Sequence, residues 1–129
     1  VESHPNIVYL TCVNSVGNVL HIDMDTEKSV ILPKSGLGGL GGDFILPVAL
    51  SNVYQFKKRL PYIDIIGCGG IRSGEDVFKH ILVGATFVQI GTHLNRKGIG
   101  CIERIEEELR HIMLNKGYQK LDDFRGHYK

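Results

Sequence analysis

The sequence predicts an α/β fold with parallel strands, arranged either as a doubly wound sheet or as part of a barrel. A short apolar strand, a loop and an amphipathic helix follow one another three times along the 129 residues, which is the pattern of successive βα units. The 16 glycines are also gathered in short clusters, and each cluster follows the end of a predicted strand. Parallel strands end at one common edge, where α/β folds bind their ligands.

The first unit begins with residues 7–13 (IVYLTCV). This run is apolar on both faces and rich in β-branched residues, which predicts a buried strand of a parallel sheet. Residues 14–18 follow as a turn. Residues 21–24 and 29–32 flank four turn-forming residues and predict a small β-hairpin insertion before the helix.

Residues 35–43 (SGLGGLGGD) predict a loop. They contain the pattern GxGxxG, but several residues separate it from the next helix. We therefore reject a dinucleotide-binding fingerprint, which lies directly between a strand and a helix. The helix of this unit begins near Pro47, because a first turn tolerates proline, and its apolar stripe ends before Pro61.

The second unit has residues 63–66 as its strand and residues 67–70 (GCGG) as its loop. Ser73 is the expected N-cap of the following helix, and Asp76, three residues later, stands in the position of a capping-box partner. We expect the helix to end at Gly84, because glycine suits a C-cap.

The third unit has residues 87–90 as its strand and residues 91–92 as its loop. An apolar stripe over residues 102–113 predicts a longer helix that closes at residues 116–117. Residues 121–126 form a short amphipathic tail.

Composition argues against several classes of protein and site. The balance of 15 basic and 14 acidic residues gives no indication of a nucleic-acid or membrane partner, and no apolar run approaches the roughly 18–20 residues of a membrane span. Three cysteines without a CxxC pair argue against a disulfide framework, which predicts a cytoplasmic location. The six histidines show no zinc-binding spacing, so we expect no metal site.

The glycine clusters predict a phosphate-binding site. A phosphate needs several backbone N–H groups close by, and a Cβ would block some of them. A helix that begins just after the loop adds the positive end of its dipole. One cluster alone is better explained as a tight turn, whereas three at one edge favour the phosphate site.

Four other residues can be weighed for a role. Asn14 and Ser15 end a strand, where their amide and hydroxyl groups either hydrogen-bond a polar ring or form a simple Asx or serine turn. Cys68 has no basic neighbour in the sequence, so we interpret it as a packing residue and not as a nucleophile. We also expect His80, which lies beside apolar positions of its helix, to be structural.

Six segments carry a further pattern: TCVNSVGN (11–18), GLGGLGG (36–42), LPVALSNV (46–53), GCGG (67–70), SGEDVFKHILVGATFVQIGT (73–92) and NKGYQKLDDFRG (115–126). Each segment alone is weak evidence, but six in this order are highly specific. Together they resemble the dihydroorotate dehydrogenase family, most of all its class 1A branch.

The resemblance implies the C-terminal part of a (β/α)8 TIM barrel with about three βα units and the small hairpin, so that residues 1–129 form a single partial domain. It implies an oxidoreductase of de novo pyrimidine biosynthesis that oxidises dihydroorotate to orotate with FMN, using fumarate as the electron acceptor. A base removes a proton from C5 of the substrate while hydride passes from C6 to the flavin. It further implies the N-terminal half of the barrel as a partner and a homodimer when the enzyme is complete.

The resemblance also implies roles for particular residues. Asn14 and Ser15 match the pair that binds orotate. The positions that match flavin contacts are Val13, Ser15, Gly41, Gly42, Cys68, Gly69, Gly70, Gly91 and Thr92. No residue of this chain matches the catalytic cysteine base, which belongs to a loop rich in Asn, Cys and Pro, so we expect that base upstream.

Two residues depart from the family pattern. Arg72 stands where class 1A relatives often carry tyrosine, and Asp43 stands where a basic residue is common. Because both lie near a loop edge, we expect them to alter surface contacts more than chemistry.

A complete barrel needs about 250 residues. We therefore expect this chain to be a fragment that does not oxidise dihydroorotate by itself. Two alternatives stay open: another FMN-binding barrel, such as the flavin domain of dihydropyrimidine dehydrogenase, and a non-catalytic module. Residues 116–126 (KGYQKLDDFRG) favour dihydroorotate dehydrogenase over the other barrel.

Overall fold

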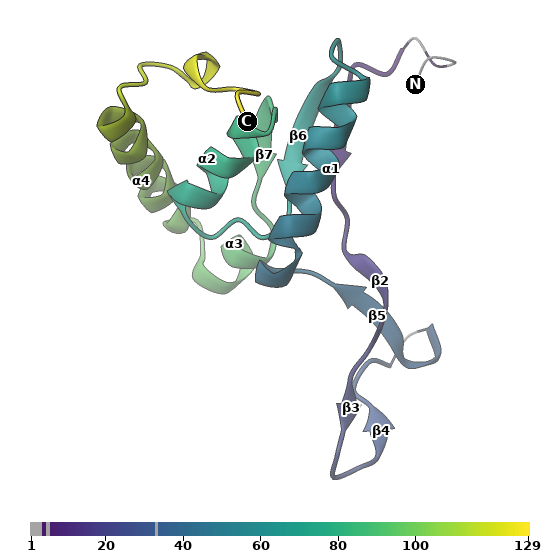
Figure 1. Cartoon of the computed structure of the whole chain (residues 1–129). Coiled ribbons are helices and arrows are strands. Elements are labelled where there is room, and N and C mark those ends of the chain that lie inside the picture. Colours follow the sequence, from purple (N-terminus) through teal and green to yellow (C-terminus); the bar gives the residue numbers. More distant parts are fainter. Residues whose placement is uncertain (1–3, 5, 33) are drawn as a thin grey trace.

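The protein is described by a computed structural model over residues 4, 6–32 and 34–129. At its centre lies a sheet of β1 (Tyr9–Cys12), β6 (Asp64–Cys68) and β7 (Phe87–Gln89). The strands lie in the order β1-β6-β7 and both neighbouring pairs are parallel, with Ile66 opposite Phe87. The carboxyl ends of the three strands therefore share one edge (Figure 1).

The described residues include four α-helices: α1 (Leu46–Arg59), α2 (Gly74–Leu82), α3 (Thr92–Lys97) and α4 (Cys101–Lys116). Because α1 follows β1, α2 joins β6 to β7, and α4 follows β7, the three predicted βα units are confirmed. The short helix α3 was not predicted, since we expected only a loop at residues 91–92. None of its residues is buried, so it has no apolar stripe for a sequence pattern to reveal.

Local residues set the ends of the helices as predicted. Pro47 lies in the first turn of α1, which stops before Pro61. At the start of α2 the Ser73 hydroxyl accepts from the Asp76 N–H, and the Asp76 carboxylate accepts from the Ser73 N–H. The capping box is therefore confirmed, with Asp in the place of Glu. Gly84 follows the C-cap of α2 with a φ of 113°, a conformation that glycine adopts without strain.

The core lies between the sheet and helices α1, α2 and α4. Phe124 of the tail is 0 % exposed, and its ring stacks on those of Phe78 and Tyr118 at 4.5 and 5.1 Å between centroids. The short 3-10 turn η3 (Leu121–Asp123) brings Phe124 to this position. The members of the core are Cys12, Val53, Ile63, Ile65, Ile71, Val77, Phe78, Ile81, Ala85, Cys101, Ile105 and Phe124.

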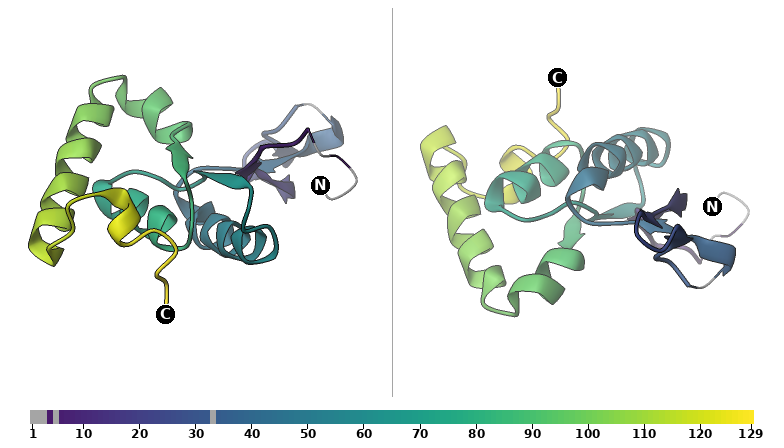
Figure 2. Two further views of the ribbon diagram at one scale, coloured as in Figure 1. Left: turned by 90° about the horizontal axis from the view of Figure 1, so that it is seen from above. Right: turned by 90° about the horizontal axis from the view of Figure 1, so that it is seen from below.

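An antiparallel ribbon between β1 and α1 stands away from the helices (Figures 1 and 2). Strand β2 (Val16–Leu20) pairs with β5 (Leu37–Leu40), and β3 (Ile22–Asp23) pairs with β4 (Lys28–Ser29). The pairing of β3 with β4 confirms the hairpin insertion, although each of these strands has only two residues.

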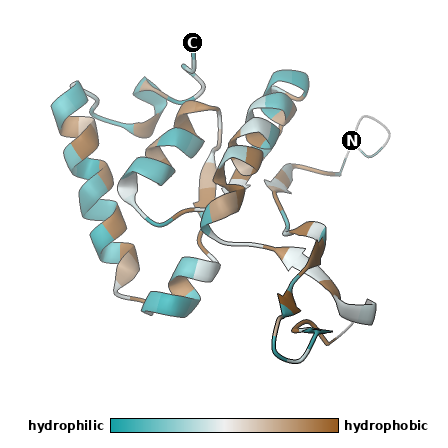
Figure 3. Ribbon diagram, turned by 60° about the horizontal axis from the view of Figure 1, so that its bottom comes forward, coloured by the Kyte–Doolittle hydropathy of each residue, from teal (hydrophilic) through white to brown (hydrophobic). Residues whose placement is uncertain are grey.

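The predictions of a turn at residues 14–18 and a loop at residues 35–43 were wrong in part. Residues 16–18 and 37–40 belong to the paired strands β2 and β5, and the remainder of the loop includes the 3-10 turn η2 (Asp43–Ile45). Glycine weakens a strand in isolation. Here the β3–β4 hairpin brings the two segments together, so that backbone pairing prevails over composition. Apolar residues of the ribbon, among them Leu20, Ile22 and Met24, nevertheless remain exposed; Figure 3 shows the hydropathy along these segments.

The prediction that the first strand is buried on both faces was also wrong for this chain. Tyr9 is 56 % exposed and Val8 is 67 % exposed, whereas Cys12 is buried. The reason is that β1 lies at an edge of the sheet, where the helices of this chain cover only part of it.

In the part of the chain that the structure describes, no helix has both the length and the apolar character to cross a bilayer.

Candidate functional site

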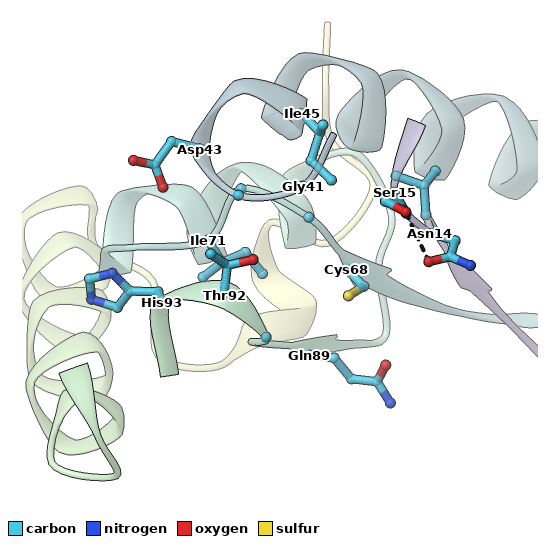
Figure 4. Close-up of a pocket in the computed structure, with 15 residues that line it drawn as sticks. Asn14, Ser15, Gly41, Asp43, Ile45, Cys68, Ile71, Gln89, Thr92 and His93 are labelled. Atoms are coloured by element: carbon cyan, nitrogen blue, oxygen red, sulfur yellow. Dashed lines mark hydrogen bonds between the residues drawn. The ribbon is translucent and has the colours of Figure 1, made fainter. Parts of the chain in front are cut away.

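A pocket of about 210 Å³ lies at the carboxyl edge of the sheet (Figure 4). The segments that follow β1, β6 and β7 reach it because these parallel strands end there, and the segment that follows β5 of the antiparallel ribbon also lines it. Its lining consists of Val13, Asn14, Ser15, Gly41, Gly42, Asp43, Ile45, Cys68, Gly69, Gly70, Ile71, Gln89, Gly91, Thr92 and His93. All the positions that the sequence singled out for substrate or cofactor lie in this lining, whereas their roles remain predictions.

Five lining residues escaped the sequence analysis as site residues: Asp43, Ile45, Ile71, Gln89 and His93. Gln89 carried a usable signal, because it is a polar residue at the carboxyl end of an otherwise apolar strand. His93 lies in the first turn of α3, the helix that the sequence pattern did not reveal. The two isoleucines resemble ordinary core residues, so no sequence signal distinguishes them.

The glycine loops have backbone conformations that only glycine adopts easily. Gly42, Gly69 and Gly70 have φ values of 84°, 132° and 76°, in the region where a Cβ is strained. These conformations turn successive peptide units in different directions at the pocket. The lining is therefore built from backbone groups to an unusual extent.

Several amides at the pocket have no acceptor. Within the described residues, the N–H groups of Gly41, Gly42, Gly69, Gly70 and Gly91 donate to no backbone or side-chain oxygen. Gly42 and Gly70 are buried, whereas Gly41 and Gly91 are exposed, and a buried amide usually finds a partner in the protein or in a bound group. An array of unpaired N–H groups from three loops is the arrangement that binds an anion such as phosphate.

Helix α3 begins at the same pocket. The first helical bond of its backbone runs from the Asn95 N–H to the Gly91 carbonyl at 3.0 Å. The amides of Thr92 and His93 therefore precede the first helical hydrogen bond and have no acceptor in the helix. Barrels commonly bind a phosphate between the loops of their last two strands and the start of a short extra helix, and α3 stands in the place of such a helix.

The glycines leave room for a ligand. A Cβ added at Gly91 would meet no atom within 4 Å, and one at Gly41 would meet only the Thr92 Oγ1 at 3.8 Å. The volume of the pocket is below the roughly 300–1,000 Å³ of sites that bury a whole drug-sized ligand. The described site thus suits a phosphate and the chain attached to it, and one end of it remains open.

Asn14 and Ser15 form one end of the pocket, opposite Asp43 and His93 (Figure 4). The Asn14 Oδ1 accepts from the Ser15 N–H at 2.8 Å, so part of the side chain supports a local turn. The Asn14 amide nitrogen and the Ser15 hydroxyl have no hydrogen-bond partner among the described residues. The structure therefore agrees with a local turn, which uses the Asn14 Oδ1. It also leaves the Asn14 amide nitrogen and the Ser15 hydroxyl for a hydrogen bond to a ligand.

Cys68 lies in the middle of the pocket lining (Figure 4). Burial raises the pKa of the Cys68 thiol above its ordinary value. The group therefore stays protonated at neutral pH, and a protonated thiol is a poor nucleophile. This agrees with its interpretation as a packing residue.

Arg72 and Asp43, which we predicted to depart from the family pattern, contact each other. The Arg72 guanidinium lies 3.4 Å from the Asp43 carboxylate, between the loop after β5 and the loop after β6. Both side chains are substantially exposed, so the pair contributes little to stability.

His80 of α2 contacts the carbonyl of Gly69 in the pocket lining. Its burial leads to a prediction about the effect of pH on stability. It is 0 % exposed, and burial lowers the pKa of its imidazole despite the nearby Asp76 carboxylate. The unfolded chain therefore binds a proton near pH 6.5, where the folded protein does not. Stability from this group is complete above about pH 6.5 and falls as the pH drops below that value.

We expect urea denaturation, followed by circular dichroism, to give a free energy of unfolding that decreases from pH 7 to pH 5. In His80→Gln, which cannot titrate, the curve should be flatter over this interval. Carboxylates contribute to the slope only nearer their ordinary values, at about pH 4. Equal slopes for the two proteins between pH 7 and pH 5 would contradict the assignment.

Three comparisons with known proteins show what the chain is similar to. The family model described as dihydroorotate dehydrogenase matches residues 1–113. The chain is 54 % identical to a dihydroorotate dehydrogenase (fumarate) of Trypanosoma cruzi over 129 residues, which is 100 % of this chain and 41 % of the relative. It is 52 % identical to a probable dihydroorotate dehydrogenase A (fumarate) of Enterococcus faecalis, over 95 % of this chain and 40 % of the relative. The chain thus spans about two fifths of the length of these relatives.

Among solved structures, the chain is similar to a dihydroorotate dehydrogenase of Eimeria tenella in complex with ferulenol. The TM-score is 0.73 at 24 % sequence identity, and the match covers 93 % of this chain and 31 % of the other. At this identity the likeness concerns the fold alone. It confirms the prediction of an α/β fold that forms part of a barrel.

Proposed function

This chain belongs to the dihydroorotate dehydrogenase family, and from that premise we propose that it forms the flavin-phosphate-binding part of an FMN-dependent enzyme. The reaction that we propose for the complete enzyme is the oxidation of dihydroorotate to orotate in pyrimidine biosynthesis, with fumarate as the electron acceptor. The names of the relatives from Trypanosoma cruzi and Enterococcus faecalis, which include fumarate, support this acceptor.

One observation carries the proposal: five glycines whose amides have no acceptor among the described residues line a single pocket together with the start of α3. A dianionic phosphate is stabilised by several N–H donors and by the positive end of a helix dipole. The lining has no lysine or arginine side chain among the described residues, so the backbone itself supplies the positive potential. This favours a ligand that enters deeply enough to contact the main chain.

The two ends of the pocket also differ from each other, which suits the different parts of the cofactor and the substrate. We assign the phosphate and ribityl chain to the segments at Gly41–Gly42, Cys68–Gly70 and Gly91–Thr92. The opposite end, with Val13, Asn14 and Ser15, is assigned to the flavin ring and orotate. The Asn14 amide and the Ser15 hydroxyl have free hydrogen-bonding groups for this purpose. The bound FMN would supply the hydride acceptor, while these residues orient the substrate against it.

We assign no catalytic base to this chain. Cys12 is buried in the core, and burial raises the pKa of both Cys12 and Cys68, which keeps these thiols protonated. We propose that the base is supplied by the N-terminal half of the barrel, that residues 1–129 act as one partial domain, and that the complete enzyme is a cytoplasmic homodimer. The free state of the described cysteines is compatible with a reducing compartment.

The test is an assay of the full-length protein that the gene encodes. With FMN, dihydroorotate and fumarate we expect turnover, whereas uracil with a nicotinamide cofactor should give none. Asn14→Ala should lower kcat/KM for dihydroorotate by about 100-fold, because it removes an amide that bonds a charged substrate, and should leave FMN affinity within about threefold.

Asn52→Ala on α1, whose side chain bonds the Val48 carbonyl within its own helix, is the matched control and should leave kcat/KM unchanged. Turnover of uracil in place of dihydroorotate would contradict the proposed substrate. An unaltered kcat/KM in Asn14→Ala would contradict the role of that residue.

A further inference from the structure

His80 occupies an unusual position beneath the second glycine loop. It lies on α2 and is 0 % exposed, and its Nε2 lies 3.1 Å from the Gly69 carbonyl oxygen. Its Nδ1 is buried without a hydrogen-bond partner among the described residues. The ring fits against Gly67, where an added Cβ would overlap the imidazole. A buried polar side chain with one unsatisfied nitrogen costs stability, so the single bond that it makes requires an explanation.

The direction of that bond follows from the chemistry of the ring. A neutral imidazole has one N–H donor, and a carbonyl oxygen only accepts. Because burial keeps the ring neutral, the proton must lie on Nε2, which donates to the Gly69 oxygen. The bond therefore fixes the tautomer of His80 and, at the same time, the direction of one carbonyl in the loop.

The carbonyl of Gly69 and the N–H of Gly70 belong to the same trans peptide group. In a planar trans peptide these two groups point in opposite directions. Because the Gly69 oxygen points toward His80 of α2, the Gly70 N–H is directed away from α2, and Gly70 itself lines the pocket. The Gly70 amide is one of those without an acceptor.

This peptide needs an external restraint. Gly69 and Gly70 have φ values of 132° and 76°, so neither residue has a Cβ that restricts rotation of the peptide plane between them. Two adjacent glycines allow the plane to turn over at low cost, which would point an oxygen in place of an N–H toward the phosphate. His80 does not line the pocket, and its bond to the Gly69 oxygen favours one of the two orientations of this peptide.

We propose that His80 is a positioning residue that holds the Gly69–Gly70 peptide so that the Gly70 N–H faces the phosphate of the cofactor. This inference rests on the proposed function and deepens it. It predicts that His80 contributes to the recognition of the phosphate and not of the flavin ring, although it contacts neither.

The experiment compares FMN with riboflavin, which has the same ring and ribityl chain without the phosphate. Dissociation constants for both are measured by flavin fluorescence on the full-length protein and its variants. His80→Leu removes the donor and should weaken FMN binding by about tenfold or more, with riboflavin binding unchanged within about twofold. His80→Gln, whose amide nitrogen can replace Nε2–H, should bind FMN within about threefold of the unaltered protein.

If His80→Leu does not fold, His80→Asn takes its place. Asparagine keeps an amide at this buried position but is one methylene shorter than glutamine, so it does not reach the Gly69 oxygen, and it should bind FMN about tenfold more weakly than His80→Gln. Equal FMN affinities for the Gln and Asn variants, or a parallel loss of FMN and riboflavin, would overturn the positioning role. Failure of the unaltered protein to bind FMN would instead overturn the proposed function.

Discussion

Gly91→Asp is expected to remove FMN binding while the fold is retained. Gly91 is the N-cap residue of α3, and aspartate is a favoured N-cap residue, so the substitution should not destabilise the helix. Its φ of −106° lies outside the left-handed region that favours glycine, and an added Cβ meets no atom within 4 Å. The new carboxylate would nevertheless lie in the pocket lining, where we place the phosphate.

The expected effect is large because both groups are negatively charged. Two unit charges about 4 Å apart near a protein surface repel by roughly 4 kcal/mol, so we expect the dissociation constant for FMN to rise at least about 100-fold. Flavin fluorescence measures the affinity, and thermal unfolding should show a Tm within about 2 °C of the unaltered protein.

Two controls separate charge from bulk. Gly91→Asn is an equally good N-cap of the same size without the charge, and we expect it to weaken FMN by about tenfold. Gly100→Asp introduces the same charge at the N-cap of α4, which lies outside the pocket lining, and should leave FMN affinity unchanged. Equal losses in Gly91→Asp and Gly91→Asn would show that no phosphate lies near this position.

Gly70→Ala is expected to be the most destabilising small substitution in the loops. With a φ of 76° an alanine would be strained, and its Cβ would lie only 2.7 Å from the backbone N and Cα of Leu46 at the start of α1. Real contacts of a Cβ with backbone are essentially never this short, so the loop and the helix must separate. We expect a loss of about 3 kcal/mol or more in the free energy of unfolding, together with at least about 100-fold weaker FMN binding.

Gly117→Ala is the matched control because it has the same φ of 76° but no atom within 4 Å of an added Cβ. It carries only the conformational cost, about 1 kcal/mol, and lies far from the pocket lining. The difference between the two variants in urea denaturation therefore isolates the close approach of the loop to α1. Similar losses of stability in both would mean that the loop and α1 do not pack as the structure has them.

Much of the fold was predictable from local signals. Pro47, the Ser73–Asp76 capping box and Gly84 mark helix ends through chemistry that operates within a few residues, and all three were assigned correctly. The pairing of β2 with β5 was missed, since it depends on a contact between segments about twenty residues apart that composition disfavours. The exposure of Tyr9 was missed for a related reason, because burial depends on neighbours in space.

The candidate site shows the same division. The glycine clusters were predicted to meet, and the structure brings Gly41, Gly69 and Gly91 to one pocket. The shared edge of the parallel strands explains the places of Gly69 and Gly91, whereas Gly41 follows a strand of the antiparallel ribbon. The unpaired amides and the bond from His80 to the Gly69 carbonyl could not be predicted. Both features depend on the direction in which individual peptide groups point. Where two glycines are adjacent, the residue types do not determine that direction.

The fit of the His80 ring against Gly67 also restricts how this protein can change over generations. A side chain at position 67 and an imidazole at position 80 exclude each other, because an added Cβ would overlap the ring. A lineage that acquires alanine at position 67 has to replace the histidine by a smaller residue, and it then loses the donor to Gly69. A substitution of Gly67 should therefore be accompanied by a substitution of His80. Another group would then have to donate to the Gly69 carbonyl and orient the loop.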